Sequence, residues 1–293
     1  MQKIATQVLL KLHECVLIPS LFYAAETRSL SAVETKQIDR IDLWALKRLF
    51  GLPPTTPTPA VRFMTGTMYA SVRIQMMQLT YLHDLLQKGD GHWANESLDV
   101  LVENNALWGK RIIKTLEEWE LEEDFNAIKL IPKITWKRRV ELAADKMNKA
   151  LILEDCQTKQ RGISREKTKT KSVIEIVERD NYRRNPSPLI SKLSCLETRA
   201  LIMGRYGMLE CKANFSCGYG SKICDECNVE DNESHRMNHC PKYRSINRYD
   251  ESVKVNFGDI YSDELKIAGP VIEAVLSMWD LANGRNKMKG VVS

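Results

Sequence analysis

The sequence predicts a mainly α-helical protein. Apolar residues recur at spacings of three to five over most of the chain, as on one face of an α-helix. Helix-start and helix-stop residues bracket several of these stretches. Strand-like alternation and hairpin turn pairs are nearly absent. We therefore expect a helical module, followed by a smaller carboxy-terminal module that also contains helices.

The clearest helix is expected between Ser31 and Gly51. Ser31 and Glu34 have the spacing of a capping box, in which each residue satisfies a backbone N–H at the start of a helix. The apolar stripe that follows consists of Val33, Ile38, Ile41, Ala45 and Leu49. Gly51 and Pro53 then end the helix, and a Pro-Thr stretch at 53–59 separates it from the next segment.

The remaining helices follow from similar stripes. One runs from Ser71 to Lys88 and ends at Gly89. Others are expected over about 93–103, 106–120, 134–156, 173–184, 188–208 and 270–284. Four methionines, Met64, Met68, Met76 and Met77, are interpreted as core filler because their flexible side chains fit irregular gaps.

A length of 293 residues predicts two modules, and the boundary is expected in the window 157–172. Ile163 is the one large apolar residue in this window, so it contributes little to a core. It would divide a helical region, 1–156, from a carboxy-terminal region, 173–293. Its six basic residues are Lys159, Arg161, Arg165, Lys167, Lys169 and Lys171, against the single acid Glu166. The whole chain has 43 Lys and Arg against 38 Asp and Glu, a net charge of +5, so this window alone accounts for the excess.

Two interpretations of the basic window stay open: a solvated linker, or a contact with a nucleic-acid backbone. A membrane partner is not expected, because the longest apolar run, 16–25, is too short to cross about 30 Å of hydrocarbon. Lys11 and Glu14 also interrupt the apolar character that a signal peptide needs. We expect an intracellular protein, nuclear or cytoplasmic.

The eight cysteines are unevenly distributed. Six of them, Cys195, Cys211, Cys217, Cys224, Cys227 and Cys240, lie in the last third of the chain. Without a secretory signal, this crowding favours a metal site over a disulfide scaffold. The remaining two, Cys15 and Cys156, are expected to be isolated and buried.

The spacing of Cys224, Cys227, His235 and Cys240 predicts a structural zinc site. Three thiolates and one imidazole complete a tetrahedral shell and leave no position for a reactive water. The residues between the two pairs, 228–234, are mostly polar and would depend on the metal for their structure. Zinc binding of this kind contributes about 10–16 kcal/mol apparent free energy, far more than so short a loop gains by burial.

Other ligand sets remain open within the zinc interpretation. His239 would replace His235, or Cys211 or Cys217 would join Cys224 and Cys227. His235 is favoured, because His239 directly precedes Cys240 and adjacent residues rarely bind one metal. The alternative to a metal site is a set of unligated thiols in a helical domain.

Two further groups are interpreted without a catalytic role. Asp39 and Asp42 share a helix face, but Arg40 and Lys47 lie nearby and favour a solvated face. His13 lies close to Cys15 in an apolar stretch, which favours packing over a nucleophile and base.

Two stretches resemble a family. The segment from Leu10 to Thr27, with the helix that ends in Leu49-Phe50-Gly51-Leu52-Pro53, resembles the region after the palm in reverse transcriptases of non-LTR (LINE-type) retrotransposons. The second stretch is similar to the carboxy-terminal zinc knuckle of the same polyproteins. It consists of Cys224-Asp225-Glu226-Cys227, Glu233-Ser234-His235, Cys240-Pro241 and Tyr243-Arg244.

The resemblance implies the thumb and connector of an RNA-directed DNA polymerase, followed by its CCHC zinc knuckle (224–240). The family's polymerase centre uses two adjacent aspartates to hold divalent metal, and this sequence contains no Asp-Asp pair. No Pro-Asp of the family's nuclease follows Cys240 either. We therefore expect a binding region and not an enzyme, with the polymerase fingers and palm, which would precede Met1, as a partner.

The expected ligand is RNA or DNA, bound through phosphates without sequence preference. Candidate contacts are Lys36, Arg40, Lys47 and Arg48 on the helix after Ser31, together with the basic residues at 159–171. The alternative function is a zinc-stabilised protein-interaction module that binds no nucleic acid.

Overall fold

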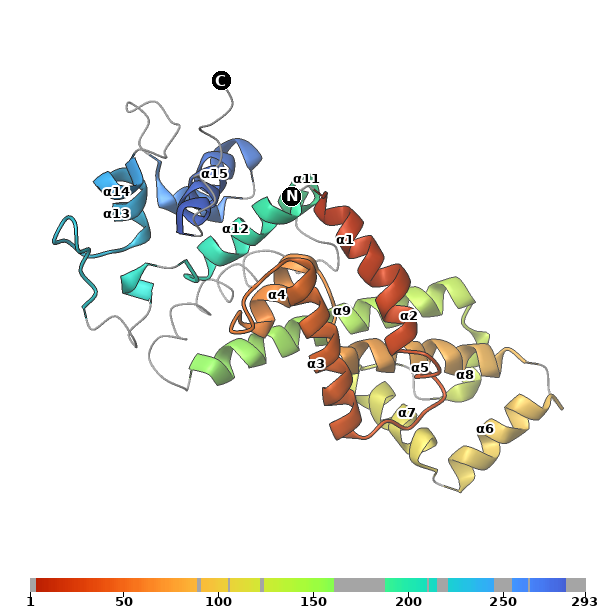
Figure 1. Ribbon diagram of the computed structural model, residues 1–293. Coiled ribbons are helices and arrows are strands. Elements are labelled where there is room, and N and C mark those ends of the chain that lie inside the picture. The colour runs from red at the N-terminus through yellow and green to blue at the C-terminus, as the bar shows by residue number, and fades with distance from the viewer. Residues whose placement is uncertain are drawn as a thin grey trace.

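The computed structural model describes residues 4–88, 91–104, 106–121, 124–160, 188–209, 211–214, 221–244, 255–262 and 264–282. Every named element in these ranges is a helix, which confirms the predicted mainly α fold (Figure 1). Strand pairing in these ranges is limited to the isolated bridges Ala5–Ser194 and Ile223–Glu230. None of the described helices is both long enough and apolar enough to cross a bilayer.

The amino-terminal part contains ten of the labelled elements. They are α1 (Thr6–Leu12), the π-helix η1 (His13–Leu17), α2 (Ile18–Leu21), α3 (Ala32–Leu49), α4 (Thr58–Thr65), α5 (Ala70–Leu86), α6 (Trp93–Glu103), α7 (Leu107–Glu118), α8 (Phe125–Leu130) and α9 (Lys133–Gln160). The carboxy-terminal part contains α11 (Pro188–Lys192), α12 (Cys195–Arg205), the 3₁₀ helices η2 (Lys212–Asn214) and η3 (Phe257–Tyr261), α13 (Glu233–Asn238), α14 (Pro241–Arg244) and α15 (Leu265–Ala282).

The start and end of α3 follow the sequence signals. The Ser31 hydroxyl accepts a hydrogen bond from the Glu34 backbone N–H at 3.2 Å, and the Glu34 carboxylate accepts one from the Ser31 backbone N–H at 2.7 Å. The helix ends at Leu49, and Gly51 follows with a φ of +60°, which an L side chain rarely adopts. The capping box and the glycine stop are both confirmed.

Several other expected helices differ in their bounds. The window 188–208 divides into α11 and α12, because Ser194 begins a new helix with its own capping box to Glu197. The last helix begins at Leu265, earlier than expected, and contains Pro270 in its interior. The expected helix at 173–184 lies outside the described residues.

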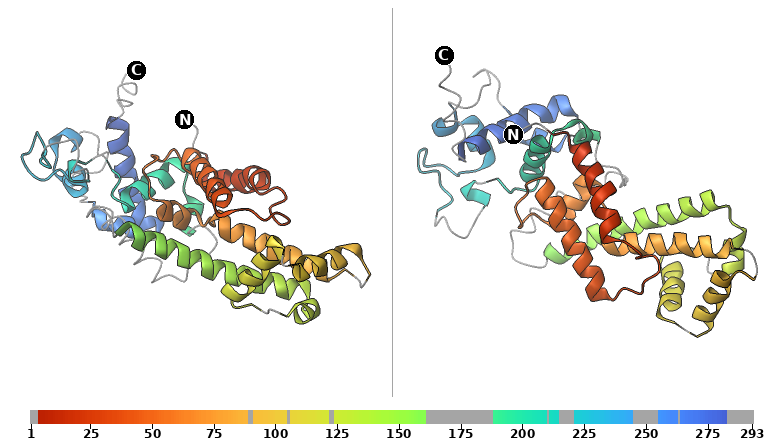
Figure 2. Two further views of the ribbon diagram at one scale, coloured as in Figure 1. Left: turned by 90° about the horizontal axis from the view of Figure 1, so that it is seen from below. Right: turned by 45° about the vertical axis from the view of Figure 1, so that its right-hand side comes forward.

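The packing joins residues from both sides of the predicted boundary. One contiguous apolar core contains Leu46 of α3, Leu82 of α5, Trp136 of α9, Leu201 of α12 and Val275 of α15. Helix α9 lies along α5, and α15 packs against α12 (Figure 1). Helices α6 to α8 and the α13–α15 region lie at opposite ends of the molecule (Figure 2).

The start of the chain also contacts the carboxy-terminal part. The Thr6 N–H donates to the Leu193 carbonyl at 3.1 Å, and the Cys195 N–H donates to the Ile4 carbonyl at 2.8 Å. The buried Thr6 and Thr198 hydroxyls form a further hydrogen bond at 2.7 Å. These bonds fix α1 beside α11 and α12.

The packing predictions for single residues have mixed outcomes. Met64 and Met68 are buried in the core, and Met76 and Met77 are half-buried, as expected of core filler. Cys156 and His13 are buried, but Cys15 is exposed, so its predicted burial was wrong. The reason is that Cys15 lies on the outer side of η1, whereas His13 faces α3, where it meets Asp42.

Candidate metal centre and candidate nucleic-acid interface

The structure brings together the four predicted metal ligands. The ligand atoms of Cys224, Cys227, His235 and Cys240 all lie within 4.8 Å of one another. The Cys240 Sγ lies 3.8 Å from the Cys224 Sγ and 3.9 Å from the Cys227 Sγ. A tetrahedral zinc ion with bonds of about 2.3 Å to sulfur separates two of its sulfurs by about 3.8 Å. The thiols therefore have the spacing of a metal shell and are too far apart for disulfides.

A tight turn places the first two cysteines. The Asn228 N–H donates to the Cys224 carbonyl at 3.0 Å, and the Cys224 N–H donates to the Val229 carbonyl at 2.8 Å. Asn228 takes a left-handed conformation, with a φ of +56°, which asparagine tolerates better than most residues. The chain therefore reverses direction at this turn, and Ile223 and Glu230 pair across it in an isolated antiparallel bridge.

The short helix α13 places the other two ligands. Asn232 caps it by accepting a hydrogen bond from the His235 backbone N–H at 2.8 Å. The His235 carbonyl then accepts the Cys240 N–H at 2.9 Å, so the second pair is held in register. The His235 Nε2 atom is buried and has no hydrogen-bond partner in the described part of the chain, as expected of a nitrogen reserved for a metal.

The thiols differ in their acidity. Burial opposes ionisation of Cys224, but the His235 ring and the backbone amides of Glu226 and Cys227 outweigh it and lower the pKa of that thiol to about 7. Burial and the neighbouring Cys240 raise the pKa of the Cys227 thiol to about 11. Several thiolates in so small a space repel one another, and a bound divalent cation removes that cost.

Charged residues near the cluster stabilise the segment around it, the knuckle (residues 221–244). Asp231 accepts two hydrogen bonds of 2.6 Å from the Arg236 guanidinium and one of 2.9 Å from the Lys212 N–H. The Arg236 guanidinium also lies 5.0 Å from the centre of the Tyr243 ring. The Asn238 side chain exchanges two hydrogen bonds with the backbone of Val255, which ties α13 to the segment before η3.

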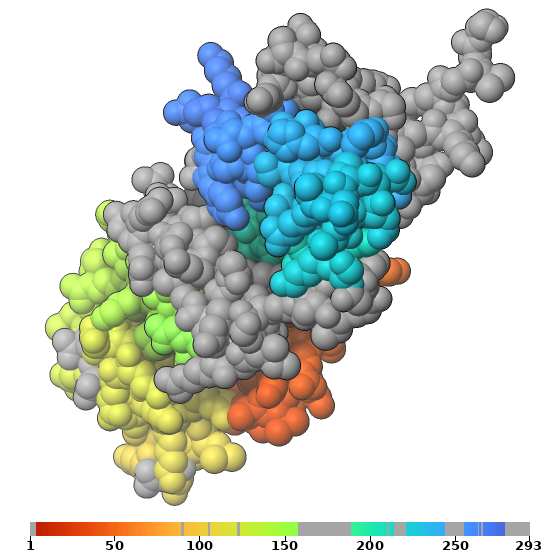
Figure 3. Space-filling view, turned by 90° about the vertical axis from the view of Figure 1, so that its left-hand side faces the viewer, coloured from red at the N-terminus to blue at the C-terminus, as the bar shows by residue number. Residues whose placement is uncertain are grey.

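The alternative ligands lie elsewhere. His239 is exposed and is not part of the cluster, and Cys211 is buried in the apolar core. Cys217 lies outside the described residues. Among the alternatives considered, the described structure gathers the ligand set with His235. Figure 3 shows the knuckle surface, in cyan, beside the blue atoms of the carboxy-terminal helices.

The predicted basic contacts of α3 lie on its outward side. Lys36, Arg40 and Arg48 are exposed, whereas Lys47 is half-buried and donates through its Nζ to the Pro54 carbonyl at 2.7 Å. Lys36 and Arg48 are twelve positions apart, or about 18 Å along the helix axis. None of the ion pairs formed within the described ranges uses Lys36, Arg40 or Arg48.

The two aspartates of α3 face inward, so their predicted solvated face was wrong. Asp42 accepts a hydrogen bond from the His13 Nε2 at 2.6 Å and forms an ion pair with Arg62. Asp39 accepts from the Arg62 Nη2 at 2.8 Å and from the Ala70 backbone N–H at 2.9 Å. The physical reason is Arg62, a buried cation on α4 that requires carboxylates around it.

This inward pairing determines the charge of the outer face of α3. Glu34 is the third acid of the helix, and it is engaged at the capping box of Ser31. Asp39 and Asp42 are directed to Arg62. The outward charges of α3 after its first turn are therefore all positive.

Trp44, which was not among the predicted contacts, also lies on this outward side. Its side chain is 63% exposed, and the Arg48 guanidinium lies 6.0 Å from its ring centre. The signal was present, because Arg40, Trp44 and Arg48 recur every four residues and so fall on one side of a helix.

The basic window 157–172 is described only at its start. Helix α9 continues to Gln160, so the first part of the window, including Lys159, is helical. Arg161, Arg165, Lys167, Lys169 and Lys171 lie outside the described residues.

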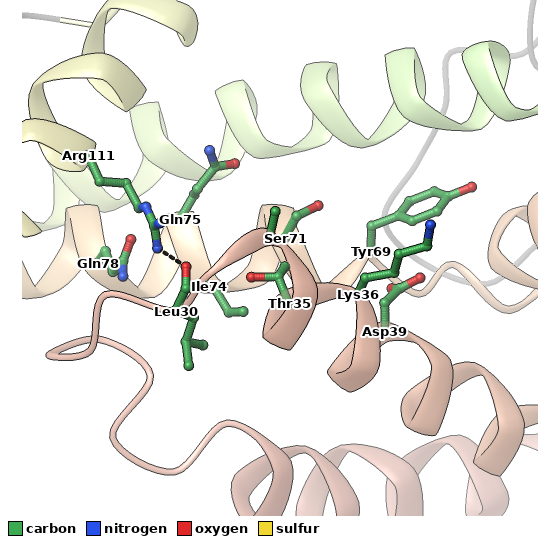
Figure 4. A pocket seen from close by; sticks show the side chains of 11 residues that line it. Leu30, Thr35, Lys36, Asp39, Tyr69, Ser71, Ile74, Gln75, Gln78 and Arg111 are labelled. Carbon is green, nitrogen blue, oxygen red and sulfur yellow. Dashed lines mark hydrogen bonds between the residues drawn. The ribbon is translucent and has the colours of Figure 1, made fainter. Parts of the chain in front are cut away.

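A pocket of about 410 Å³ lies between α3 and α5 (Figure 4). Lys36 and Asp39 line it from α3, and Arg111 reaches it from α7 and donates to the Leu30 carbonyl. Asp39 already accepts two hydrogen bonds there, from Arg62 and Ala70. Asp39 and Arg111 thus already have partners within the fold.

No protein-family model matches the chain, and the curated proteins and the solved structures give no match to it either. The function is therefore inferred from the residues and their geometry.

Proposed function

We propose that this chain is a nucleic-acid-binding region of a retroelement RNA-directed DNA polymerase, comprising a thumb-and-connector-like helical part and a zinc knuckle. The observation that carries this proposal is the all-positive outer face of α3. Lys36, Arg40 and Arg48 lie exposed there, while Asp39 and Asp42 of the same helix pair inward with Arg62. Such a face suits the phosphates of a duplex or a strand, without sequence preference.

The metal in this proposal is zinc, held by Cys224, Cys227, His235 and Cys240. The sulfur spacing and the unpartnered His235 Nε2 support it. Four protein ligands close the shell, so the ion would stabilise the knuckle and leave no site for water activation. The chain would act by binding, and we expect purified protein to incorporate no nucleotides on a primed template, because it lacks paired aspartates.

The salt dependence of binding tests the nucleic-acid proposal. A primed RNA template is titrated with protein at several salt concentrations, and the logarithm of the affinity is plotted against that of the salt. If all four basic residues of α3 neutralise phosphates of a duplex, they contribute about −3.6 to the slope, at about −0.9 each. Neutralising Lys36, Arg40 and Arg48 to Gln should flatten the slope by about 2.7.

A matched control separates a local site from net charge. Lys137, Arg138 and Arg139 are three exposed cations on α9, and their neutralisation changes the net charge equally. Equal effects of the two triple variants would contradict a site on α3. A parallel variant in the basic window, with Lys159, Arg161, Arg165, Lys167, Lys169 and Lys171 changed to Glu, measures the share of that cluster.

A second function has an observation of its own. The surface of the knuckle carries the exposed acids Glu226 and Glu230 and the exposed apolar side chains Ile223 and Val229, while Asp225 is paired with Lys212 at 2.6 Å. Acids repel phosphates, so this surface favours a protein partner and supports the alternative of a zinc-stabilised interaction module. Absence of nucleic-acid binding by the wild-type chain at low salt would favour that alternative.

A further inference from the structure

A groove of about 400 Å³ lies between the η1 region and α3. Leu12, Val16 and Leu17 line one side, and Trp44, Arg48 and Leu49 line the other. Leu12, Val16 and Trp44 are all substantially exposed, although each is large and apolar. An apolar groove that opens beside a row of cations differs from the ordinary charged surface of a helix.

Trp44 forms the exposed rim of this groove. Arg40 and Arg48 lie one turn before and one turn after it, so the three side chains alternate cation, ring and cation at steps of about 6 Å. An extended nucleic-acid strand alternates its phosphates and bases in a similar way. Aromatic rings stack on bases, and nearby arginines bind the adjoining phosphates.

His13 lies in the wall of the groove and ties it to α3. Its side chain lines the groove and is only 1% exposed. The His13 Nε2 must carry a hydrogen, because it bonds to the Asp42 carboxylate, which only accepts. The Nδ1 atom is then left buried, without a hydrogen-bond partner among the described residues. A buried polar atom of this kind is uncommon.

We propose that this groove binds one unpaired base of a single-stranded RNA or DNA. The base stacks on Trp44, and Arg40 and Arg48 bind the phosphates on either side. This inference rests on the proposed nucleic-acid-binding function and narrows it to single strands at this groove. The charges on the outer face of α3 are all positive, which favours a polyanionic ligand. The exposed Trp44 ring between two arginines favours a polyanion that also carries bases, which is a nucleic acid.

The test compares Trp44 with the other strongly exposed tryptophan of the described residues, Trp93, which is 73% exposed on α6. Wild type, Trp44→Leu, Trp44→Phe and Trp93→Leu are titrated with an oligouridylate and with a blunt-ended duplex. Because base stacking on an aromatic ring contributes much of single-strand affinity, Trp44→Leu should weaken oligouridylate binding about tenfold, while Trp44→Phe retains most of it. Duplex binding, and the salt slope on both ligands, should stay unchanged in all three variants, because stacking releases no counterions.

Quenching of tryptophan fluorescence gives a second readout that does not depend on Trp44→Leu folding. Oligouridylate should quench the wild-type emission, and the quenching should disappear in Trp44→Phe but persist in Trp93→Leu. Equal single-strand affinity of wild type and Trp44→Leu would overturn this inference while leaving the proposed function in place. If the wild type bound neither ligand, the proposed function would fail as well. If the groove bound an acidic peptide but no oligonucleotide, the inference would be overturned, and its ligand would be a protein.

Discussion

Arg62 of α4 and Asp42 of α3 form an ion pair that is almost wholly removed from solvent, with exposed side-chain fractions of 0% and 1%. Asp39 pairs with the same guanidinium from one turn earlier on α3, and His13 reaches Asp42 from η1. The pair therefore joins three helical segments and holds α3 with its acids inward. The basic outer face of α3 is a consequence of this buried contact.

We predict that Asp42→Asn strongly destabilises the fold. Removing one partner of a buried pair leaves an uncompensated charge, and such losses cost about 3–5 kcal/mol. Asp39 still faces Arg62, so the loss should lie near the lower end of that range. Urea denaturation measures it, with Asp99→Asn on the exposed side of α6 as the matched control. Equal midpoints for the two variants would contradict a structural role for Asp42.

We also predict that part of the acid sensitivity of this protein comes from Asp42. Burial by itself would raise the pKa of the Asp42 carboxyl, but the hydrogen bond from His13 and the charge of Arg62 outweigh it and lower that pKa. A carboxyl with a lowered folded-state pKa adds stability above its unfolded pKa of about 3.9, and this stability is lost as the pH falls through the folded value.

Urea midpoints measured from neutral pH down to about pH 3 check the prediction, since the unfolded pKa lies near 3.9. The wild type should lose more stability over this range than Asp42→Asn. Parallel curves for the two proteins would assign the acid sensitivity to other carboxylates, such as Asp231, whose pKa is also lowered.

The contact between α12 and η3 gives a packing prediction. A Cβ added at Gly204 would lie 2.1 Å from the Cδ1 of Ile260, which is fully buried. The η3 backbone has little freedom to retreat, because the Ile260 carbonyl accepts a hydrogen bond from the Arg205 Nε at 2.8 Å. The overpacking in Gly204→Ala should cost about 1–3 kcal/mol. Alanine regains about 1 kcal/mol of helix propensity, so the expected net loss is up to about 2 kcal/mol.

A double variant tests the cause of that loss. Ile260→Val removes the Cδ1 atom, so Gly204→Ala combined with Ile260→Val should lose less stability than the sum of the two single variants. Additive losses in thermal or urea denaturation would show that the steric contact is not responsible.

The sequence predicted features whose cause is local. The bounds of α3 come from Ser31, Glu34 and Gly51, which act within one or two turns of the helix ends. The four residues of the candidate metal site lie within seventeen positions, so their spacing alone indicated how they would gather.

The inward orientation of Asp39 and Asp42 could not be predicted in the same way. It depends on Arg62, at a separation of about twenty residues and beyond a Pro-Thr stretch that gave no helix signal. The helix α4 that carries Arg62 begins at Thr58, inside that stretch, and has Pro59 in its first turn. Whether a polar side chain of a helix faces water or a buried partner depends on such tertiary contacts, which local periodicity does not contain.

The candidate metal site gives the last prediction: we expect one zinc ion per chain, bound by Cys224, Cys227, His235 and Cys240. His235→Ala should lose most of the metal, because the buried Nε2 has no other partner among the described residues, whereas the exposed His239→Ala should retain it. Chelation should increase hydrogen exchange across 221–244 and leave α5 and α9 protected, since those helices pack in the main core. Metal analysis and hydrogen exchange on the full chain measure both effects. Full zinc content in His235→Ala together with zinc loss in His239→Ala would show that His239, and not His235, is the ligand. Absence of bound metal in the wild type would show that the three thiols and the imidazole lie together without an ion.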